Sequence, residues 1–126
     1  GVPVAFGHDC VMDPWYSLGS GDMLEVAHMA VHAAQLTSLD AMRAAFASVT
    51  TTPATILGLE GYGVTPGNYA DLVLLDASDP IEAIRLKATR LLVVRRGAII
   101  ARTPPRATEL HLVDRPRNIS LRRTTA

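Results

Sequence analysis

GVPVAFGHDCVMDPWY, residues 1–16 of this 126-residue chain, passes from an apolar run into a cluster of polar side chains. Residues 2–6 are almost all apolar, a pattern that predicts a β-strand covered on both faces. His8, Asp9 and Cys10 follow directly, and each of these side chains can bind a metal ion or transfer a proton. Because α/β proteins place reactive groups at the carboxyl ends of strands, the stretch predicts an α/β fold with a functional site at this point.

Asp9 is the main candidate for a metal ligand, although a lone aspartate also serves as a cap or as a surface residue. A catalytic zinc site usually takes three protein ligands, so Asp9 cannot form one by itself. His8 is adjacent, but neighbours on a regular strand point to opposite faces, and we expect His8 to pack outward or to bond to a neighbour. Cys10 is either a nucleophile or an inert thiol, and no residue near it in the sequence is an evident base.

Two histidines in the next apolar stretch form a second candidate. His28 and His32 are four residues apart and share one face of a helix, a spacing that can bind metal. The residues between them lack the glutamate of a metalloprotease motif. Their apolar surroundings favour a hydrogen-bonded role in a core or an interface. Residues 58–67 are rich in glycine but lead into a strand, so the fingerprints of phosphate and dinucleotide loops are absent.

Capping residues and hydrophobic spacing predict the rest of the elements. Asp22 begins an almost wholly apolar helix that should be heavily buried, with Glu25 reaching back as in a capping box. The later caps are Ser38, Thr52 before Pro53, and Asp79 before Pro80. The predicted helices are residues 22–35, 38–49, 54–57 and 81–86, and the predicted strands are residues 2–6, 70–76, 91–94, 98–101 and 109–113. Strands on both sides of the helices predict two separate sheets.

Composition excludes several classes of protein. Apolar residues make up 48% and charged residues 19%, which fits a globular chain and not a disordered one. No run is long enough to span a membrane, and the single cysteine excludes an internal disulfide. Residues 1–84 carry a net charge of −9 and residues 85–126 a net charge of +9. The two halves either face each other or leave a basic end for an anionic partner, and too few aromatic residues accompany the arginines for a nucleic-acid platform.

The first residues lead straight into the predicted strand. Gly1 is not a methionine, and neither a cap nor a turn precedes the apolar run. This abrupt start leads us to expect that the chain is the C-terminal part of a longer one.

Four stretches of the sequence resemble the amidohydrolase superfamily. TPAxxLGL at residues 52–59 and GxxxGxxADLV at residues 63–73 are similar to the C-terminal signature of many members. RRGAII at residues 95–100 resembles the closing hairpin of that family. GHDxxxDPWYxLG at residues 7–19, followed by DML at residues 22–24, resembles bacterial cytosine deaminases in particular.

The resemblance implies roles for three residues near the start of the chain. Asp9 falls where the family binds its catalytic metal and relays a proton, and Trp15 falls where a tryptophan lines the pyrimidine pocket. Cys10 departs from the family, which has a second aspartate there, close to the substrate ring. A neutral thiol at this point favours a related cyclic substrate, such as isocytosine, creatinine or a triazine, over cytosine itself.

The resemblance also implies an α/β fold with distinct parts. Residues 1–59 would hold the last strand and following helices of a (β/α)8 barrel, residues 60–103 a portion of a small β-sandwich, and residues 104–126 a basic tail. One divalent metal ion, iron or zinc, is the expected cofactor of the full-length enzyme. No His-x-His pair occurs here, so we expect this chain alone neither to hold the metal tightly nor to turn over.

The expected partners follow from the same reasoning. We expect a small cyclic nitrogenous substrate, homo-oligomeric assembly and a cytoplasmic location, with no nucleic acid and no membrane as partner. The alternative is a free-standing, non-catalytic interaction domain, which would use the helix at residues 22–35 as an interface and the basic tail as a contact.

Overall fold

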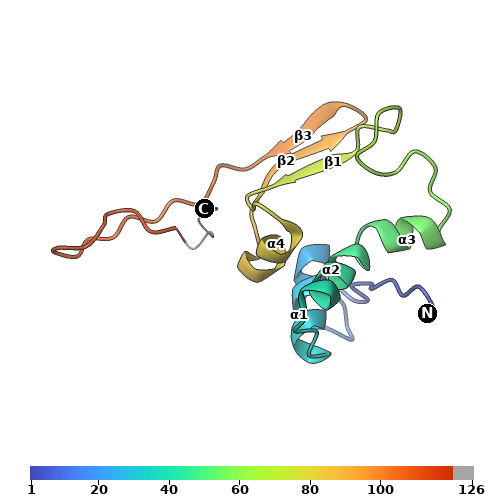
Figure 1. The fold of residues 1–126 in the computed structure, drawn as a ribbon, viewed down its shortest axis with the longest axis horizontal. Coiled ribbons are helices and arrows are strands. Elements are labelled where there is room, and N and C mark those ends of the chain that lie inside the picture. Colours follow the sequence, from blue (N-terminus) through green and yellow to red (C-terminus); the bar gives the residue numbers. More distant parts are fainter. Residues whose placement is uncertain (121–126) are drawn as a thin grey trace.

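Residues 1–120 are described by the computed structural model, in which helices and a small antiparallel sheet form separate layers (Figure 1). Three helices begin at the capping residues that the sequence predicts, namely α1 (Met23–Ala33), α2 (Leu39–Ala47) and α4 (Pro80–Leu86). Their caps Asp22, Ser38 and Asp79 each accept hydrogen bonds from backbone N–H groups of the first turn. These N–H groups have no partner within the helix, which is why a polar side chain fixes each start.

The third helix begins earlier than predicted. α3 (Thr51–Ile56) has Thr50 as its cap residue in place of Thr52, and the side chain of Thr50 makes no capping bond. The hydroxyl of Thr50 donates instead to the carbonyl of Phe46, at 2.8 Å. Pro53 therefore lies in the first turn, where its missing N–H leaves no helical bond unmade.

The sheet contains β1 (Leu72–Leu75), β2 (Arg90–Arg95) and β3 (Ala98–Arg102), in the antiparallel order β1-β2-β3. The predicted hairpin is present: Arg96 and Gly97 connect β2 to β3 with φ angles of 49° and 81°. Two positive φ angles in succession match the strand twist, and glycine adopts them without strain. The α/β class is confirmed in this coarse form.

Three helices share the hydrophobic core. Its buried members are Leu24, Ala27, Ala83, Ile84 and Ala88, and partly buried side chains of α2 and β1 pack against them. The alanines at three of these positions let α1 and α4 approach closely, because a methyl group separates two helix backbones less than a larger side chain does. Figure 1 shows α4 at the junction, beneath the sheet and beside α1 and α2.

The predicted heavy burial of α1 is wrong. Leu24 and Ala27 are buried, but Met29 on the other side of the helix is 60% exposed. An apolar helix becomes buried all round only where neighbours cover every face, and the core neighbours of α1 lie on one side. The predicted backward reach of Glu25 is present in a relayed form: its carboxylate accepts from the Ser20 hydroxyl, and Ser20 accepts from the N–H of Asp22.

One ion pair joins the helical layer to the sheet. Both carboxylate oxygens of Asp22 accept hydrogen bonds from the guanidinium of Arg90 in β2. The bonds to Arg90 are the main cause that holds the pKa of Asp22 below its usual value, and those to Leu24 and Glu25 add to it. The same pair raises the pKa of Arg90. Asp22 is therefore both a helix cap and an interlayer contact.

The predicted strand at residues 2–6 is not formed. The segment is extended, Val2 is 87% exposed, and no strand within residues 1–120 pairs with it. Its backbone N–H at Phe6 donates to the carbonyl of Ser48, at 2.9 Å. A strand requires a hydrogen-bonding neighbour, which the apolar pattern cannot supply by itself. The described residues accordingly contain one sheet, not the two predicted.

The predicted strand at residues 109–113 is wrong, since only an isolated bridge between Glu109 and Asn118 forms there. Figure 1 shows the chain after β3 running away from the helices as a long excursion. Residues 121–126 of the predicted basic tail lie outside the described residues. No helix within residues 1–120 is both long and apolar enough to cross a membrane.

The turn between β2 and β3 is fastened to the loop that precedes β1. Asp71 accepts hydrogen bonds from the side chain of Arg95 (2.9 Å) and from the backbone N–H of Arg96 (2.6 Å). The guanidinium carbon of Arg96 lies 3.7 Å from the ring centroid of Tyr69, a cation–π contact. The N–H of Tyr69 donates to the carbonyl of Gly61 at 3.0 Å. These contacts hold the loop against the hairpin.

Gly61→Ala is expected to destabilise this loop more than a matched glycine substitution. Gly61 has φ 68°, and an added Cβ would lie 2.8 Å from the Tyr69 ring. Gly58 has φ 62° and no heavy atom within 4 Å of its added Cβ, so Gly58→Ala isolates the backbone strain. We expect G61A to lower the free energy of unfolding by about 1–3 kcal/mol more than G58A, measured by urea titration. Equal losses in the two variants would show that the Tyr69 contact contributes nothing.

Candidate functional site

The polar residues after the extended segment lie in a loop that folds back on itself. The N–H of Met12 donates to the carbonyl of Leu18 (3.0 Å), and the N–H of Asp13 donates to the carbonyl of Tyr16 (3.1 Å). Asp13 Oδ1 also accepts from the backbone N–H groups of Trp15 (2.9 Å) and Tyr16 (3.0 Å). An aspartate–proline pair is typical of a turn, and here the turn is present and the aspartate side chain stabilises it.

Asp9 has the left-handed backbone conformation, with φ 63°, and is exposed. Aspartate is one of the residues that tolerate this conformation. The Nδ1 atom of His8 is hydrogen bonded to the carbonyl of Cys10 at 3.1 Å, so the two residues that flank Asp9 hold each other. The expectation that His8 bonds to a neighbour is confirmed.

Gly19 packs against this turn from the far end of the loop. Its φ is 94°, and an added Cβ would lie 2.6 Å from His8 Cε1 and 3.1 Å from the carbonyl oxygen of Cys10. Any side chain at this position must therefore push the His8 ring aside. In the sequence, Gly19 is only the last residue of the motif at residues 7–19, because the approach of the His8 ring is visible only in three dimensions.

Gly19→Ala is expected to displace the His8 ring. Gly21→Ala is the matched control, because Gly21 also has a positive φ, 69°, with no heavy atom within 4 Å of its added Cβ. We expect the NMR signals of the His8 ring to shift in G19A and to stay unchanged in G21A. A His8 ring with identical signals in all three proteins would contradict this packing.

The Cys10 thiol and the Asp13 carboxylate shift each other's pKa. Asp13 is the main cause of a raised pKa at the Cys10 thiol, and desolvation and the charge of Asp9 add to it. Cys10 in turn is the main cause of a lowered pKa at Asp13, with the N–H of Trp15 adding. Cys10 therefore remains a neutral thiol near neutral pH, which disfavours its interpretation as a nucleophile.

The predicted site residues line one hollow between the loop and α1. Its volume is about 1190 Å³, somewhat larger than most small-molecule pockets, and it is open to solvent. His8, Asp9, Cys10 and Trp15 line it from the loop. The residues that line it from α1 are Glu25, Val26, Met29, Ala30 and Ala33. The structure thus brings all three predicted site residues together beside a largely apolar, partly exposed face of α1.

These residues do not form a complete metal site. Within residues 1–120, no group of three or more His, Cys, Asp or Glu side chains is placed to hold a metal ion. Asp9 offers one carboxylate at the surface of the hollow, and Cys10 beside it keeps its proton. The donor set therefore fits a contribution of one ligand and does not fit a whole divalent-metal centre.

The two helix histidines have a structural role. His28 Nδ1 is hydrogen bonded to the carbonyl of Ile84 in α4, at 3.1 Å. The rings of His28 and His32 meet edge to face, with centroids 4.6 Å apart. The hydrogen-bonded interpretation is confirmed for His28, which joins α1 to α4.

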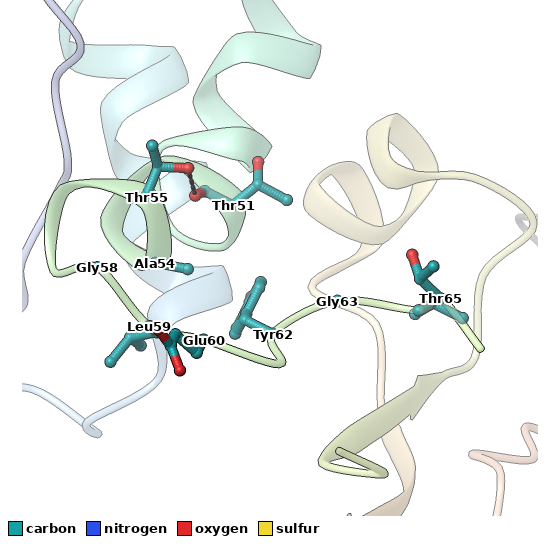
Figure 2. A pocket seen from close by; sticks show the side chains of 10 residues that line it. Thr51, Ala54, Thr55, Gly58, Leu59, Glu60, Tyr62, Gly63 and Thr65 are labelled. Carbon is teal, nitrogen blue, oxygen red and sulfur yellow. Dashed lines mark hydrogen bonds between the residues drawn. The ribbon is translucent and has the colours of Figure 1, made fainter. Parts of the chain in front are cut away.

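A second hollow lies beside α3, between that helix and the loop that leads to β1 (Figure 2). Thr51, Thr55 and Thr65 contribute hydroxyl groups to its lining. The hydroxyl of Thr55 donates to the carbonyl of Thr51 at 3.0 Å, the dashed line in Figure 2, so it is already used. None of the predicted site residues lines this hollow, and we assign no chemistry to it.

Comparisons with known proteins identify a family. The sequence profile of the amidohydrolase family matches residues 1–102. Pterin deaminase of Rhizobium rhizogenes is 37% identical over 114 residues, which cover 90% of this chain. Among solved structures, 5-methylcytosine deaminase of Klebsiella pneumoniae, liganded with 5-fluorocytosine, has a TM-score of 0.78 at 32% identity over 83% of the chain. N-isopropylammelide isopropylaminohydrolase of Burkholderia multivorans has a TM-score of 0.77 at 41% identity over 81% of the chain.

The chain spans 26% of the length of each of these proteins. The matches confirm the predicted resemblance to a C-terminal amidohydrolase-superfamily segment similar to cytosine deaminase. They leave the roles of Asp9, Cys10 and Trp15 as predictions. With its profile matched over most of its length, the chain belongs to the amidohydrolase family.

Proposed function

We propose that the chain is the C-terminal segment of a metal-dependent hydrolytic deaminase that acts on cytosine or a related cyclic amidine and releases ammonia. Asp9, Cys10 and Trp15 are its contributions to the active site. The observation that carries the proposal is that these three residues, chosen from sequence alone, line one open hollow. The similarity to two deaminases and an aminohydrolase supports the class of reaction.

The proposed reaction replaces an exocyclic amino group by oxygen. Water adds to the ring carbon that bears the amino group, the bond from that carbon to nitrogen breaks, and ammonia leaves. The carboxylate of Asp9 accepts the proton of the attacking water and delivers it to the departing nitrogen. Its exposed position in the hollow gives it access to both groups.

The proposed cofactor is one divalent ion, iron or zinc. Such an ion, held in part by Asp9, would make the attacking water more acidic near neutral pH. Asp9 would hold one coordination position, and the proposal assigns the other ligands to the rest of a longer enzyme. The relatives, of which this chain spans about a quarter, support that assignment. Homo-oligomeric assembly and a cytoplasmic location remain part of the proposal.

The purified 126-residue chain is expected to hold far less than one equivalent of metal. A single exposed carboxylate binds a divalent ion weakly, because affinity comes from several ligands acting together. Elemental analysis after dialysis measures this, with the Asp9→Asn chain as control. One tightly held equivalent that disappears in D9N would contradict the incomplete site.

The substrate is proposed from the environment of Cys10. A neutral thiol cannot form the charge-assisted hydrogen bond that a carboxylate forms with a ring N–H. The proposal therefore favours rings that need no carboxylate at this point, such as isocytosine, creatinine or a triazine. Cytosine and 5-methylcytosine are the compounds against which these rings are compared.

The experiment that tests the proposed function is an ammonia-release assay on the enzyme that contains this chain, with each of these compounds. Release from at least one ring supports a deaminase, and the ratio of kcat/KM values identifies the ring. The absence of release from every ring would contradict the proposal and favour the alternative, a non-catalytic interaction domain.

A further inference from the structure

We propose that Asp13 is a positioning residue that fixes Trp15 beside the hollow by accepting two backbone hydrogen bonds. Asp13 does not line the hollow, whereas Trp15 does. The inference rests on the proposed function only in that Trp15 is taken to contact the substrate ring.

The indole of Trp15 needs a positioning device because packing does not hold it. The side chain is 88% exposed, so few neighbours restrict its motion. Its place beside the hollow is therefore set by its backbone. Pro14, the preceding residue, has its φ fixed by its ring, which removes one rotation between Asp13 and Trp15.

The Asp13 side chain supplies the remaining restraint. Its Oδ1 atom accepts from the N–H of Trp15 at 2.9 Å and from the N–H of Tyr16 at 3.0 Å. The backbone N–H of Asp13 donates to the carbonyl of Tyr16 at 3.1 Å, which closes the turn. Bonds from N–H groups to a carboxylate are stronger than neutral ones, so one side chain holds two consecutive residues of the loop.

The effect of Asp13 on the hollow is indirect, because its carboxylate holds the backbone of the loop and does not itself line the hollow. One side chain outside the hollow thus holds a residue that lines it. A change at Asp13 should alter how the pocket binds a ring without removing any group that reacts.

The first test measures the hydrogen bonds directly in the 126-residue chain. Asp13→Ala removes the acceptor, whereas Asp13→Asn keeps a carbonyl oxygen at the Oδ1 position. Amide hydrogen exchange at Trp15 and Tyr16 should become about tenfold faster in D13A, and D13N should restore most of the protection. Asp40→Ala is the control, since Asp40 is exposed and pairs only locally with Arg43 at 3.2 Å.

Trp15 provides an independent signal, because it is the only tryptophan in the chain. Its fluorescence anisotropy should fall in D13A, since the indole then moves on a freer backbone, and should stay near the wild-type value in D13N and D40A. Unchanged exchange at Trp15 and Tyr16 together with unchanged anisotropy in D13A would overturn the proposal.

The second test uses the enzyme that contains this chain, with isocytosine as the probe. D13A should raise KM about tenfold with little change in kcat, because a misplaced Trp15 weakens binding without removing a reacting group. D13N should restore KM. A fall in kcat with unchanged KM would overturn the positioning role. Lack of ammonia release by the wild-type enzyme would contradict the proposed function, while the exchange and anisotropy results would still decide the role of Asp13.

Discussion

Replacement of Asp9 by asparagine is expected to reduce ammonia release by the enzyme that contains this chain by about 10³-fold or more. Asparagine has nearly the same shape as aspartate, but it carries no charge and cannot accept the proton of the attacking water. The fall should appear in kcat and in kcat/KM alike, because the lost interaction belongs to the transition state. Steady-state assays of ammonia release measure it.

The D9N substitution is a clean test because it leaves the local backbone unstrained. Asp9 has φ 63°, and asparagine tolerates that conformation as aspartate does. Asp40→Asn is the matched control, since it removes an exposed carboxylate that does not line the hollow and should leave kcat unchanged. A D9N enzyme with the kcat of the wild type would remove Asp9 from the mechanism.

The second large effect is expected on stability, at Asp22. Asp22→Ala removes the cap of α1 and leaves the half-buried guanidinium of Arg90 without this partner. Loss of a cap costs about 1 kcal/mol, and loss of a partner by a charged group costs about 1–2 kcal/mol. We therefore expect D22A to lower the free energy of unfolding by about 2–3 kcal/mol, measured by urea titration at neutral pH.

Two control variants separate these contributions. Asp22→Asn keeps an acceptor for the helix cap but loses the charge that pairs with Arg90, so its loss should be smaller than that of D22A. Asp40→Ala removes an exposed carboxylate and should change stability by no more than about 0.5 kcal/mol. If D22A were no less stable than D40A, Asp22 would not link the two layers.

The contribution of Asp22 should also depend on pH. Arg90 holds the pKa of Asp22 below its usual value in the folded chain. The stabilisation is therefore fully present above the ordinary aspartate value of about 3.9 and is lost as pH falls through the lower folded pKa. We expect the difference in unfolding free energy between wild type and D22N to shrink as pH falls below about 4. A constant difference from neutral pH to acid would contradict the pairing.

The features that could be predicted from the sequence are local ones. Three of the predicted helix caps are present, at Asp22, Ser38 and Asp79, because a cap depends only on residues within one turn of the helix. The turn at Arg96 and Gly97 could likewise be predicted, because a tight hairpin turn depends on a few consecutive residues.

Two of the incorrect predictions, the strand at residues 2–6 and the heavy burial of α1, depend on distant neighbours. Residues 2–6 have the pattern of a buried strand, but a strand forms only against a partner, and the described residues provide none. Met29 is apolar like a core residue, yet it borders the open hollow and stays exposed. The early start of α3 is a local feature instead, since the Thr50 hydroxyl donates to the carbonyl of Phe46, four residues earlier, and makes no capping bond.

The candidate site also contains residues that the sequence predicts and residues whose roles only the structure shows. Asp9, Cys10 and Trp15 were predicted from a contiguous motif, and they lie together because one short loop carries them. The roles of Asp13 and Gly19 could not be predicted. The first depends on which N–H groups a side chain reaches, and the second depends on the approach of the His8 ring. An Asp-Pro pair signals a turn, but it does not say what the turn holds in place.

The most direct test of the proposed active site is the metal dependence of ammonia release by the enzyme that contains residues 1–126. The enzyme is first treated with a chelator and then supplied with zinc or iron, while isocytosine and cytosine serve as substrates. We predict that release stops on metal removal, returns when either ion is added, and does not return in D9N. Release that continues in full after metal removal, or that returns equally in D9N, would contradict the assignment of Asp9 as part of a metal-dependent deaminase site.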